Sequence, residues 1–321
     1  MKTEKNLFEK ICDYNNLKLA FYKASRRKQS SGSYLYFRRF SDTNLELIYK
    51  QLINQTYTIG NYRQFTISDP KERLITAAAF EERIIHHAII NVLEPIFEKQ
   101  FIYHTYACRK GKGTHSAIKY AQKCCANSKY FLKLDVKKYF DNIDHNILNQ
   151  KLCKIIADDR CLSLLFAIIE SYSTSEGKGV PIGNLTSQYF ANYYLSGLDH
   201  YVLENLKPKS GLKYYVRYMD DMIIFADTIE VLRKVFDDVN DYVEKKLNLM
   251  LKPPIYGSIK NGLPFLGSLI HSDKIVLLRE KQRLKKKKIK KIDYLVRTGK
   301  ITQEKASERI TAILATARFD F

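Results

Sequence analysis

Apolar residues recur at helical spacing along much of this chain. Residues 79–98 place Ile85, Ile89, Val92 and Ile96 on one side of a helix. A long helix after residue 184 carries an apolar residue at every fourth position, from Phe190 to Val202. Other helices are expected at 5–24, 42–54, 145–157, 160–172, 229–247, 279–299 and around 306–317.

Strand patterns separate these helices. Residues 62–67 and 129–135 alternate polar and apolar side chains, and residues 213–225 form a longer apolar run. That run predicts two strands meeting at a tight turn, Tyr218-Met219-Asp220-Asp221, and further strands are expected near 249–256 and 264–271. Together these elements predict an α/β (α+β) fold, with an antiparallel sheet backed by helices on one face.

The two adjacent carboxylates at this turn are electrostatically unfavourable. Like charges side by side are costly unless a positive group compensates, and the turn lacks the Asn-Gly or Asp-Gly pair that tight hairpins prefer. A divalent metal ion is a natural compensator. The alternative, on these residues alone, is a polar hairpin tip that faces solvent.

A third acid, Asp135, ends the strand at 129–135. If that strand lies beside the hairpin, Asp135, Asp220 and Asp221 come together. Three carboxylates with no partner lysine would form a hard-oxygen site for Mg²⁺, with Mn²⁺ as an alternative. Two such ions about 3.5–4 Å apart can activate a 3′-hydroxyl and stabilise a leaving pyrophosphate. By contrast, Asp144 directly precedes a helix and is expected to cap it.

The chain is strongly basic, with 54 Lys and Arg against 34 Asp and Glu and a net charge of +20. This surplus, with 23 Tyr and 17 Phe, favours a nucleic-acid partner over an ordinary basic surface. The six cysteines show no zinc spacing, so reduced core thiols are expected. No signal peptide or membrane-length apolar run is present, which predicts a cytoplasmic protein that binds no membrane.

Three basic segments are candidates for nucleic-acid contact. Residues 25–33 form a basic loop with Gly and Ser, and residues 106–115 place two glycines among basic residues before a helix. Residues 279–300 hold eleven Lys and Arg against two acids on an amphipathic helix. The individual candidates are Arg109, Lys110, Lys112, Tyr218, Lys285 and Lys288.

The ordered motifs resemble those of reverse transcriptases, from about Tyr62 through His271. Tyr218-Met219-Asp220-Asp221 is similar to the family's catalytic hairpin, Leu132–Phe140 resembles its first metal-binding strand, and Pro264–Ser268 resembles the loop at the base of the thumb. The resemblance implies a right-hand polymerase with an N-terminal segment and fingers at 1–127, a palm at 128–274 and a basic helical thumb at 275–321. Residues 145–180 of the palm range would contribute partly to the fingers.

The same resemblance implies roles for individual residues. Asp135, Asp220 and Asp221 would be catalytic and would bind the metal ions, with the Val136 carbonyl adding a contact. Phe140 would be the steric gate against a ribonucleotide 2′-hydroxyl. Lys71 and Arg73 would contact the incoming dNTP, since a guanidinium both binds phosphate and stacks on a base.

Residues 180–188, Val-Pro-Ile-Gly-Asn-Leu-Thr-Ser-Gln, differ from most bacterial members, which have Pro-Gln-Gly and a small residue followed by Pro at the corresponding places. Ile182-Gly183 and Thr186-Ser187-Gln188 resemble the reverse transcriptases of diversity-generating retroelements. This implies cDNA synthesis from a template-repeat RNA through an RNA/cDNA duplex, errors at template adenines, and a basic accessory variability protein as partner. Ile182 can neither donate nor accept a hydrogen bond, so it would hold the nucleotide loosely.

Two other functions remain open on the sequence. One is a retron, group II intron-like or phage-defence reverse transcriptase. The other is a non-catalytic RNA-binding protein on a polymerase scaffold, against which the three intact aspartates argue. The identity of the template RNA, the priming mode, the oligomeric state and the surface for the accessory protein are not encoded in any motif.

Overall fold

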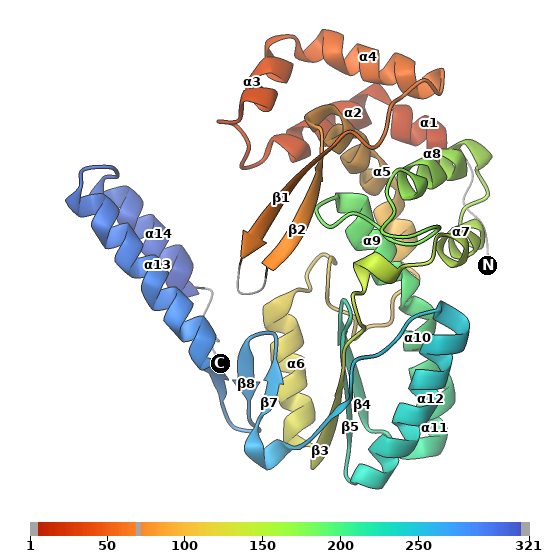
Figure 1. Ribbon diagram of the computed structural model, residues 1–321, viewed down its shortest axis with the longest axis vertical. Coiled ribbons are helices and arrows are strands. Elements are labelled where there is room, and N and C mark those ends of the chain that lie inside the picture. Colours follow the sequence, from red (N-terminus) through yellow and green to blue (C-terminus); the bar gives the residue numbers. More distant parts are fainter. Residues whose placement is uncertain (1–5, 69–71, 316–321) are drawn as a thin grey trace. The chain divides into compact units, whose positions relative to one another are not determined.

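The chain forms two compact units in the computed structural model, which describes residues 6–68 and 72–315 (Figure 1). The first unit comprises Met1–Tyr103, Asp135–Asn205 and Asp237–Pro253, and the second comprises His104–Leu134, Leu206–Phe236 and Pro254–Phe321. Each unit is therefore assembled from separate parts of the sequence. The expected mixture of helices and antiparallel sheets is confirmed.

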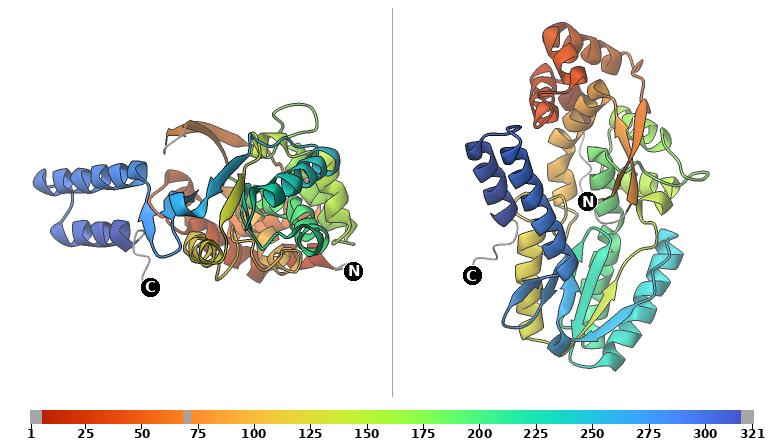
Figure 2. Two further views of the ribbon diagram at one scale, coloured as in Figure 1. Left: turned by 90° about the horizontal axis from the view of Figure 1, so that it is seen from below. Right: turned by 60° about the vertical axis from the view of Figure 1, so that its left-hand side comes forward.

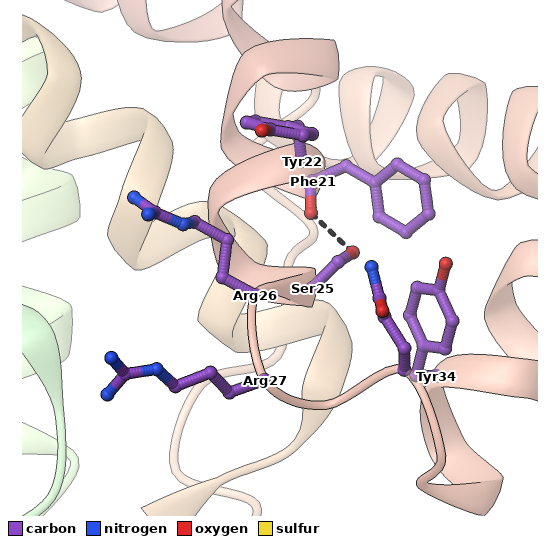
Figure 3. A pocket seen from close by; sticks show the side chains of 7 residues that line it. Phe21, Tyr22, Ser25, Arg26, Arg27 and Tyr34 are labelled. Atoms are coloured by element: carbon purple, nitrogen blue, oxygen red, sulfur yellow. Dashed lines mark hydrogen bonds between the residues drawn. The ribbon is translucent and has the colours of Figure 1, made fainter. Parts of the chain in front are cut away.

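The first unit begins with four helices: α1 (Leu7–Cys12), α2 (Tyr14–Ser25), α3 (Gly32–Arg39) and α4 (Ser41–Ile53). The single helix predicted at 5–24 is broken at Asp13, because its side chain accepts from Asn16 N at 3.0 Å and caps α2. At the other end of α2, Ser25 Oγ donates to Phe21 O at 2.6 Å (Figure 3). Helix α3 lacked a sequence signal, since its start falls inside the Gly/Ser loop.

A two-stranded hairpin and a long helix follow. Strands β1 (Tyr62–Ser68) and β2 (Glu72–Ala78) pair antiparallel, and α5 (Phe80–Glu98) buries the apolar side that its spacing predicted. The unit continues with the short 3₁₀ turn η1 (Phe140–Asn142), α7 (His145–Cys153) and α8 (Asp159–Glu170). The predicted cap of α7 is confirmed, because Asp144 Oδ1 accepts from Ile147 N at 3.1 Å.

The long helix predicted after residue 184 is interrupted. It divides into α9 (Leu185–Tyr194), α10 (Ser196–His200), a π-helical turn at Tyr201–Leu206, and α11 (Lys207–Ser210). The break follows Leu195, where Ser196 Oγ donates to Tyr193 O at 2.7 Å. A serine that bonds back to the preceding turn competes with the regular helical pattern. The apolar period nevertheless holds, since Phe190, Tyr194, Leu198 and Val202 are all buried.

The second unit contains the main sheet, which has the order β4-β5-β3-β6 and is antiparallel throughout. Its strands are β3 (Tyr130–Leu134), β4 (Tyr214–Tyr218), β5 (Asp221–Ala226) and β6 (Ile255–Ser258). Gly257 on β6 is required by packing, because a Cβ there would lie 2.2 Å from the Phe131 ring. Helix α6 (Thr114–Ala126) covers the sheet with Ala117, Ile118 and Ala121 in the shared core (Figure 1).

Strand β6 begins later than predicted. Residues 249–254 form one isolated bridge, Val136 with Leu251, rather than a strand. Pro253 and Pro254 have no backbone N–H, so they cannot extend a ladder of hydrogen bonds. Helix α12 (Ile229–Leu247) precedes this segment and has the predicted bounds.

A small sheet and two helices complete the second unit. After the 3₁₀ turn η3 (Ile259–Asn261), strands β7 (Leu263–Phe265), β8 (Ser268–Ile270) and β9 (Ile275–Leu277) pair in that order. Helices α13 (Arg279–Arg297) and α14 (Gln303–Ala315) lie side by side in both projections (Figure 2), with Ile292 and Ala306 buried. Over the described residues, no helix has the length and apolar character needed to span a membrane.

Candidate catalytic and nucleotide-binding residues

The predicted hairpin carries its two acids at a strained turn. Tyr218 pairs with Asp221, and Met219 between them has a φ of 58°, in the left-handed region that side chains with a Cβ seldom adopt. Arg217 is 0 % exposed, and its Nη1 donates to Met219 O at 2.9 Å. A buried guanidinium therefore holds the turn in a conformation that the sequence does not favour locally.

Asp221 has a lysine partner. Lys133 Nζ donates to Asp221 Oδ2 at 3.2 Å and to Pro264 O at 3.2 Å. Lys133 pairs across the sheet with Ile223, so Asp221, two residues before Ile223, lies on the same face of the sheet as Lys133. Through its two contacts, Lys133 links Asp221 of the hairpin to Pro264 of β7.

Asp135 also has a lysine partner. Lys252 Nζ donates to Asp135 Oδ1 at 2.7 Å, and Lys252 N donates to Asp135 O at 2.8 Å. Val136 forms a bridge with Leu251 and is buried. The expectation of carboxylates without a partner lysine is therefore wrong for Asp135 and Asp221, because a partly buried carboxylate is stabilised by a nearby cation.

The register of the main sheet places Asp135 one residue beyond the strand that pairs with the hairpin. Leu134, the last residue of β3, pairs with Met222, which directly follows Asp221. Asp135 is the next residue after Leu134, so the predicted pairing of this strand with the hairpin is confirmed up to that point. Among the described residues, no group of three or more His, Cys, Asp and Glu side chains is arranged to hold a metal ion.

The residues expected to contact the nucleotide belong to the first unit and share a backbone network. Val180 N donates to Phe140 O at 2.9 Å, and Thr76 N donates to Ile182 O at 2.8 Å. Arg73 is exposed on the same strand as Thr76, opposite Ile67. Lys71 lies outside the described residues.

Gly183 is fixed by its surroundings. Its φ is 135°, and a Cβ at this position would lie 2.9 Å from Thr76 O and 3.1 Å from Ile75 Cγ2. Only glycine fits such a close approach of loop and strand. The Ile182-Gly183 pair is thus held against β2.

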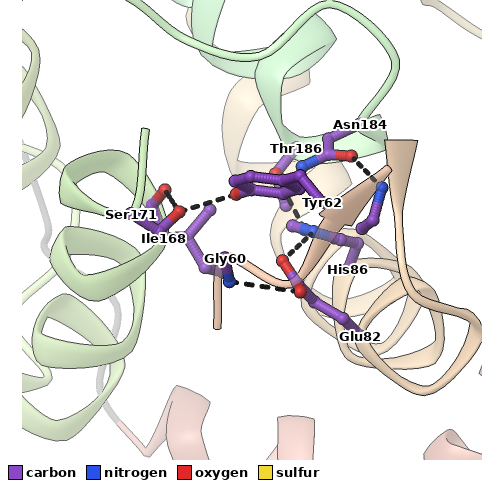
Figure 4. Close-up of polar contacts among 9 residues, drawn as sticks. Gly60, Tyr62, Glu82, His86, Ile168, Ser171, Asn184 and Thr186 are labelled. Carbon is purple, nitrogen blue, oxygen red and sulfur yellow. Dashed lines mark hydrogen bonds and ion pairs between the residues drawn. The ribbon is translucent and has the colours of Figure 1, made fainter. Parts of the chain in front are cut away.

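Buried polar groups join this loop and the first turn of α9 to α5 and β2 (Figure 4). The hydroxyl of Thr186 and His86 Nδ1 are 2.9 Å apart, and His86 Nε2 lies 3.4 Å from Glu82 Oε1. Asn184 Oδ1 accepts from Ala78 N at 3.2 Å, which ties the loop to β2 as well. The two hydrogen bonds fix the position of the loop, because their loss would leave His86 Nδ1 and Asn184 Oδ1 buried without these partners.

A cavity of about 180 Å³ lies beside this network, lined by residues of α5 and of the loop. Burial, helped by the nearby Arg83 and Lys23 cations, lowers the pKa of His87 on its wall to about 4. The cavity wall therefore carries a neutral imidazole and the Arg83 guanidinium at neutral pH. Gly183 and Gln188 of the distinctive sequence stretch also line it.

Two basic side chains of the loop at residues 106–113 make contacts within the second unit. Arg109 Nη1 donates to Thr105 O at 2.7 Å, and Lys112 Nζ lies 5.2 Å from the centre of the Tyr106 ring. Both side chains thus brace the loop, whereas Lys110 is exposed. Beyond the loop, Thr114 Oγ1 donates to the Tyr218 hydroxyl at 3.3 Å.

The basic helix α13 exposes most of its cations. Lys288 is exposed and Lys285 is half-buried. The Lys281 side chain is bound to the protein itself, since its Nζ donates to Leu266 O at 2.9 Å.

Three residues near the acids were not identified from the sequence: Lys133, Arg217 and Lys252. Lys133 and Arg217 could have been found from the sequence, because each is a charged residue inside a predicted strand that is otherwise rich in apolar residues. Lys252 offered no such signal, because its contact with Asp135 joins segments far apart in the sequence.

Comparison with known families matches residues 67–254, more than half of the chain, to the profile described as "Reverse transcriptase (RNA-dependent DNA polymerase)". The chain is 27% identical over 174 residues to "Group II intron-encoded protein LtrA" of Lactococcus lactis subsp. cremoris, covering 51% of this chain and 29% of that protein. It is 22% identical over 271 residues to "Putative COX1/OXI3 intron 2 protein" of Saccharomyces cerevisiae, covering 65% of this chain and 30% of that protein. The chain thus spans less than a third of the length of these two relatives.

Among solved structures, telomerase from Candida tropicalis in complex with a TWJ fragment of telomeric RNA aligns with a TM-score of 0.53 at 13% identity, covering 84% of this chain and 56% of that one. Truncated apo telomerase from the same organism aligns with a TM-score of 0.51 at 14% identity, covering 69% and 55%. At this identity the likeness concerns the fold alone. It confirms the predicted right-hand polymerase fold.

Proposed function

This chain belongs to the reverse transcriptase (RNA-dependent DNA polymerase) family, and we propose that it copies RNA into DNA. The observation that carries the proposal is the hairpin with Asp220 and Asp221, which lies inside the matched region and is held in a strained turn by Arg217. Strain that the surrounding structure maintains is common at functional sites.

We assign metal binding to Asp135, Asp220 and Asp221, together with the Val136 carbonyl. These groups supply hard oxygen donors, which suit Mg²⁺ and, as an alternative, Mn²⁺. When bound, two such ions supply Lewis-acid activation of the primer 3′-hydroxyl and neutralise charge on the pyrophosphate. Lys133 Nζ contacts one oxygen of Asp221 and Lys252 Nζ contacts one oxygen of Asp135, so each lysine offsets part of the negative charge at the site.

The remaining residues position the nucleotide in this proposal. Arg73 and Lys71 bind the phosphates of the dNTP, and Phe140 excludes a 2′-hydroxyl by contact with the sugar. The carbonyl of Phe140 is hydrogen-bonded to the loop that carries Ile182 and Gly183. A shift of that loop would therefore move the nucleotide-contacting residues together.

The proposal divides the chain into fingers at 1–127, a palm at 128–274 to which residues 145–180 add a finger portion, and a thumb at 275–321. The antiparallel β4-β5-β3-β6 sheet supports the palm assignment. The pair of helices α13 and α14, with exposed lysines such as Lys288, supports a thumb that grips template and primer.

We further propose that the enzyme serves a diversity-generating retroelement. It would make cDNA from a template-repeat RNA, with errors at template adenines, and act with an accessory variability protein. The support is the sequence Ile182-Gly183 followed by Thr186-Ser187-Gln188. In the structure this stretch is held against β2 and α5 by Thr76 and His86.

The role of Ile182 can be tested by substitution. Ile182→Gln restores an amide that can hydrogen-bond the nucleotide, so adenine-specific errors are expected to fall several-fold while synthesis continues. Sequencing of the cDNA measures both. Ile147→Gln, an apolar-to-amide change on α7, is the control and should leave the error pattern unaltered. Unchanged adenine errors in Ile182→Gln would argue against this role.

A second candidate function is a group II intron-like reverse transcriptase, favoured by the 27% identity to LtrA over 174 residues. The two candidates differ in their products. Errors concentrated at template adenines support the retroelement enzyme, and errors spread evenly over all template bases support the intron-like enzyme.

Primer extension on an RNA template, with and without Mg²⁺, tests the activity itself. The wild-type chain is expected to synthesise DNA only with a divalent ion. Asp220→Asn combined with Asp221→Asn should abolish synthesis, because the amides remove two anionic ligands. DNA synthesis by this double variant would refute the metal assignment.

A further inference from the structure

The N-terminal helices carry a pocket that includes part of the basic loop at residues 25–33 but none of the residues assigned above to catalysis or nucleotide binding. It has a volume of about 510 Å³ and lies in the first unit, lined by α2, the following loop and Tyr34 of α3. The pocket precedes residue 67, where the match to the family begins. Family membership therefore assigns it no role, and its size lies within the range of about 300–1,000 Å³ found for small-ligand sites.

The loop between α2 and α3 is a succession of tight turns. Lys28 N donates to Ser25 O at 3.0 Å, and Ser31 N donates to Lys28 O at 2.9 Å. Arg27 adopts a φ of 60°, in the left-handed region. This backbone sends the Arg26 and Arg27 side chains out in the same direction (Figure 3).

The two arginines have no anionic partner within the described part of the chain. Neither side chain makes a hydrogen bond or an ion pair there. From Tyr14 to Ser41 the sequence holds seven Lys and Arg and no Asp or Glu. Paired guanidinium groups without a carboxylate form a site for phosphate, whose oxygens match the fork of N–H donors.

Aromatic rings complete the pocket. Phe21 and Tyr34 stack with centroids 6.2 Å apart, and Phe37 and Phe80 pack behind them, with Phe37 5.2 Å from Phe21. This wall is rigid because its rings come from α2, α3 and α5. The neighbouring Tyr22 is 67% exposed and leaves its ring available for stacking.

We propose that this pocket binds one unpaired nucleotide of a single-stranded nucleic acid, with its phosphate on Arg26 and Arg27 and its base on Tyr22. Base stacking on an aromatic ring tolerates every base, and a base inside a duplex has no free face to offer. An acidic peptide would satisfy the arginines but not the exposed ring. The site goes beyond the proposed polymerase function, since it holds a strand outside the residues assigned to catalysis.

The strand is either the RNA template or the DNA product, and binding measurements distinguish them. The full chain carrying Asp220→Asn and Asp221→Asn is saturated with unlabelled template–primer. Fluorescence anisotropy then follows labelled 12-nucleotide RNA or DNA of one unstructured sequence. Because no polymerisation is needed, failure of the proposed activity would leave this test intact.

Arg26→Ala with Arg27→Ala is expected to raise Kd about 10-fold and to reduce the slope of log K against log salt by about 0.7, for the one phosphate that is no longer neutralised. Tyr22→Ala should raise Kd several-fold with the slope unchanged, and Tyr22→Phe should restore affinity. The matched control, Lys10→Ala with Lys50→Ala, removes the same charge from α1 and α4 outside the pocket.

A loss seen with RNA alone assigns the pocket to the template, and a loss seen with DNA alone assigns it to the product. Either result, or both losses together, supports the site. Equal losses in the arginine and lysine double variants would overturn it, because bulk charge would then explain binding. Full affinity in Tyr22→Ala would overturn the stacking role. Thermal unfolding followed by circular dichroism verifies that each variant is folded.

Discussion

At the scale of single residues, the turn that carries Asp220 and Asp221 depends on the charge of Arg217, which solvent does not reach. Arg217 is fully buried beneath the hairpin and bonds to the carbonyl of Met219, the residue in the left-handed conformation. Its planar guanidinium supplies several donors in fixed directions, which a lysine ammonium cannot reproduce.

Arg217→Lys is therefore expected to lower the free energy of unfolding by about 1.5–3 kcal/mol, the usual range for a lost hydrogen bond to a charged group. Urea denaturation measures the change, and primer extension should fall with it as the turn loosens. Arg63→Lys, at an exposed position of β1, is the control and should alter stability by less than about 0.5 kcal/mol. Equal effects of the two substitutions would contradict the role of Arg217.

Individual residues also show where sequence reasoning succeeded. The cap at Asp144 and the position of the Tyr218–Asp221 turn between two strands follow from the local sequence pattern, and both were predicted correctly. The partners of Asp135 and Asp221 were not, because Lys252 and Lys133 meet these acids only through tertiary structure. A one-dimensional pattern contains no such distances.

At the scale of elements, the start of α9 is tied to α5, and the loop before it to β2, by polar contacts rather than by apolar packing alone. The contact between Thr186 and His86 is fully buried, and so is that between Asn184 and Ala78 N. This arrangement fixes the direction in which Ile182 and Gly183 enter the helix.

Thr186→Val keeps the shape of the side chain and removes its hydroxyl. His86 Nδ1 is then left buried without this partner, so the free energy of unfolding should fall by about 1–3 kcal/mol. Ser163→Ala removes a hydroxyl that bonds to Asp159 O on the exposed side of α8, and it should cost less than about 0.5 kcal/mol. Equal values for both variants in urea titrations would show that the buried contact adds nothing.

The ends of helices and strands were predictable where a regular apolar spacing stops at a recognisable residue. Helix α12 agrees with its predicted bounds. The break at Asp13 and the start of α3 at Gly32 were missed, because Asp, Ser and Gly also occur at many positions that do not end or begin a helix. The strand expected near 249–256 begins only at Ile255, since Pro253 and Pro254 cannot donate to a ladder. The apolar spacing of the sequence thus predicted which helices and strands form, whereas side-chain caps and prolines determined where several of them begin and end.

At the scale of the whole molecule, the reactivity of the cysteine thiols can be used to follow unfolding, because both units contain buried cysteines. All six are free thiols, and burial raises the pKa of Cys12, Cys124, Cys125 and Cys161 to about 12. Such thiols are protonated and shielded at neutral pH, so they react slowly. Cys153 is exposed.

Iodoacetamide is accordingly expected to label Cys153 first in the native protein and the four buried thiols only after unfolding. Mass spectrometry of proteolytic peptides measures each rate. Cys153→Ser should remove the fast phase and leave the slow ones as they were. Rapid native labelling of Cys124 or Cys161 would show that the corresponding unit opens readily.

The order of the main sheet has a consequence for the chain during its synthesis. Strand β3 ends at Leu134, yet its neighbours β5 and β6 begin at Asp221 and Ile255. At about 5–20 residues per second, a ribosome needs on the order of ten seconds to supply them. During that interval Phe131, Leu132 and Leu134 have no strand partner, so the nascent polypeptide carries an apolar segment whose backbone is unpaired until β5 and β6 are made.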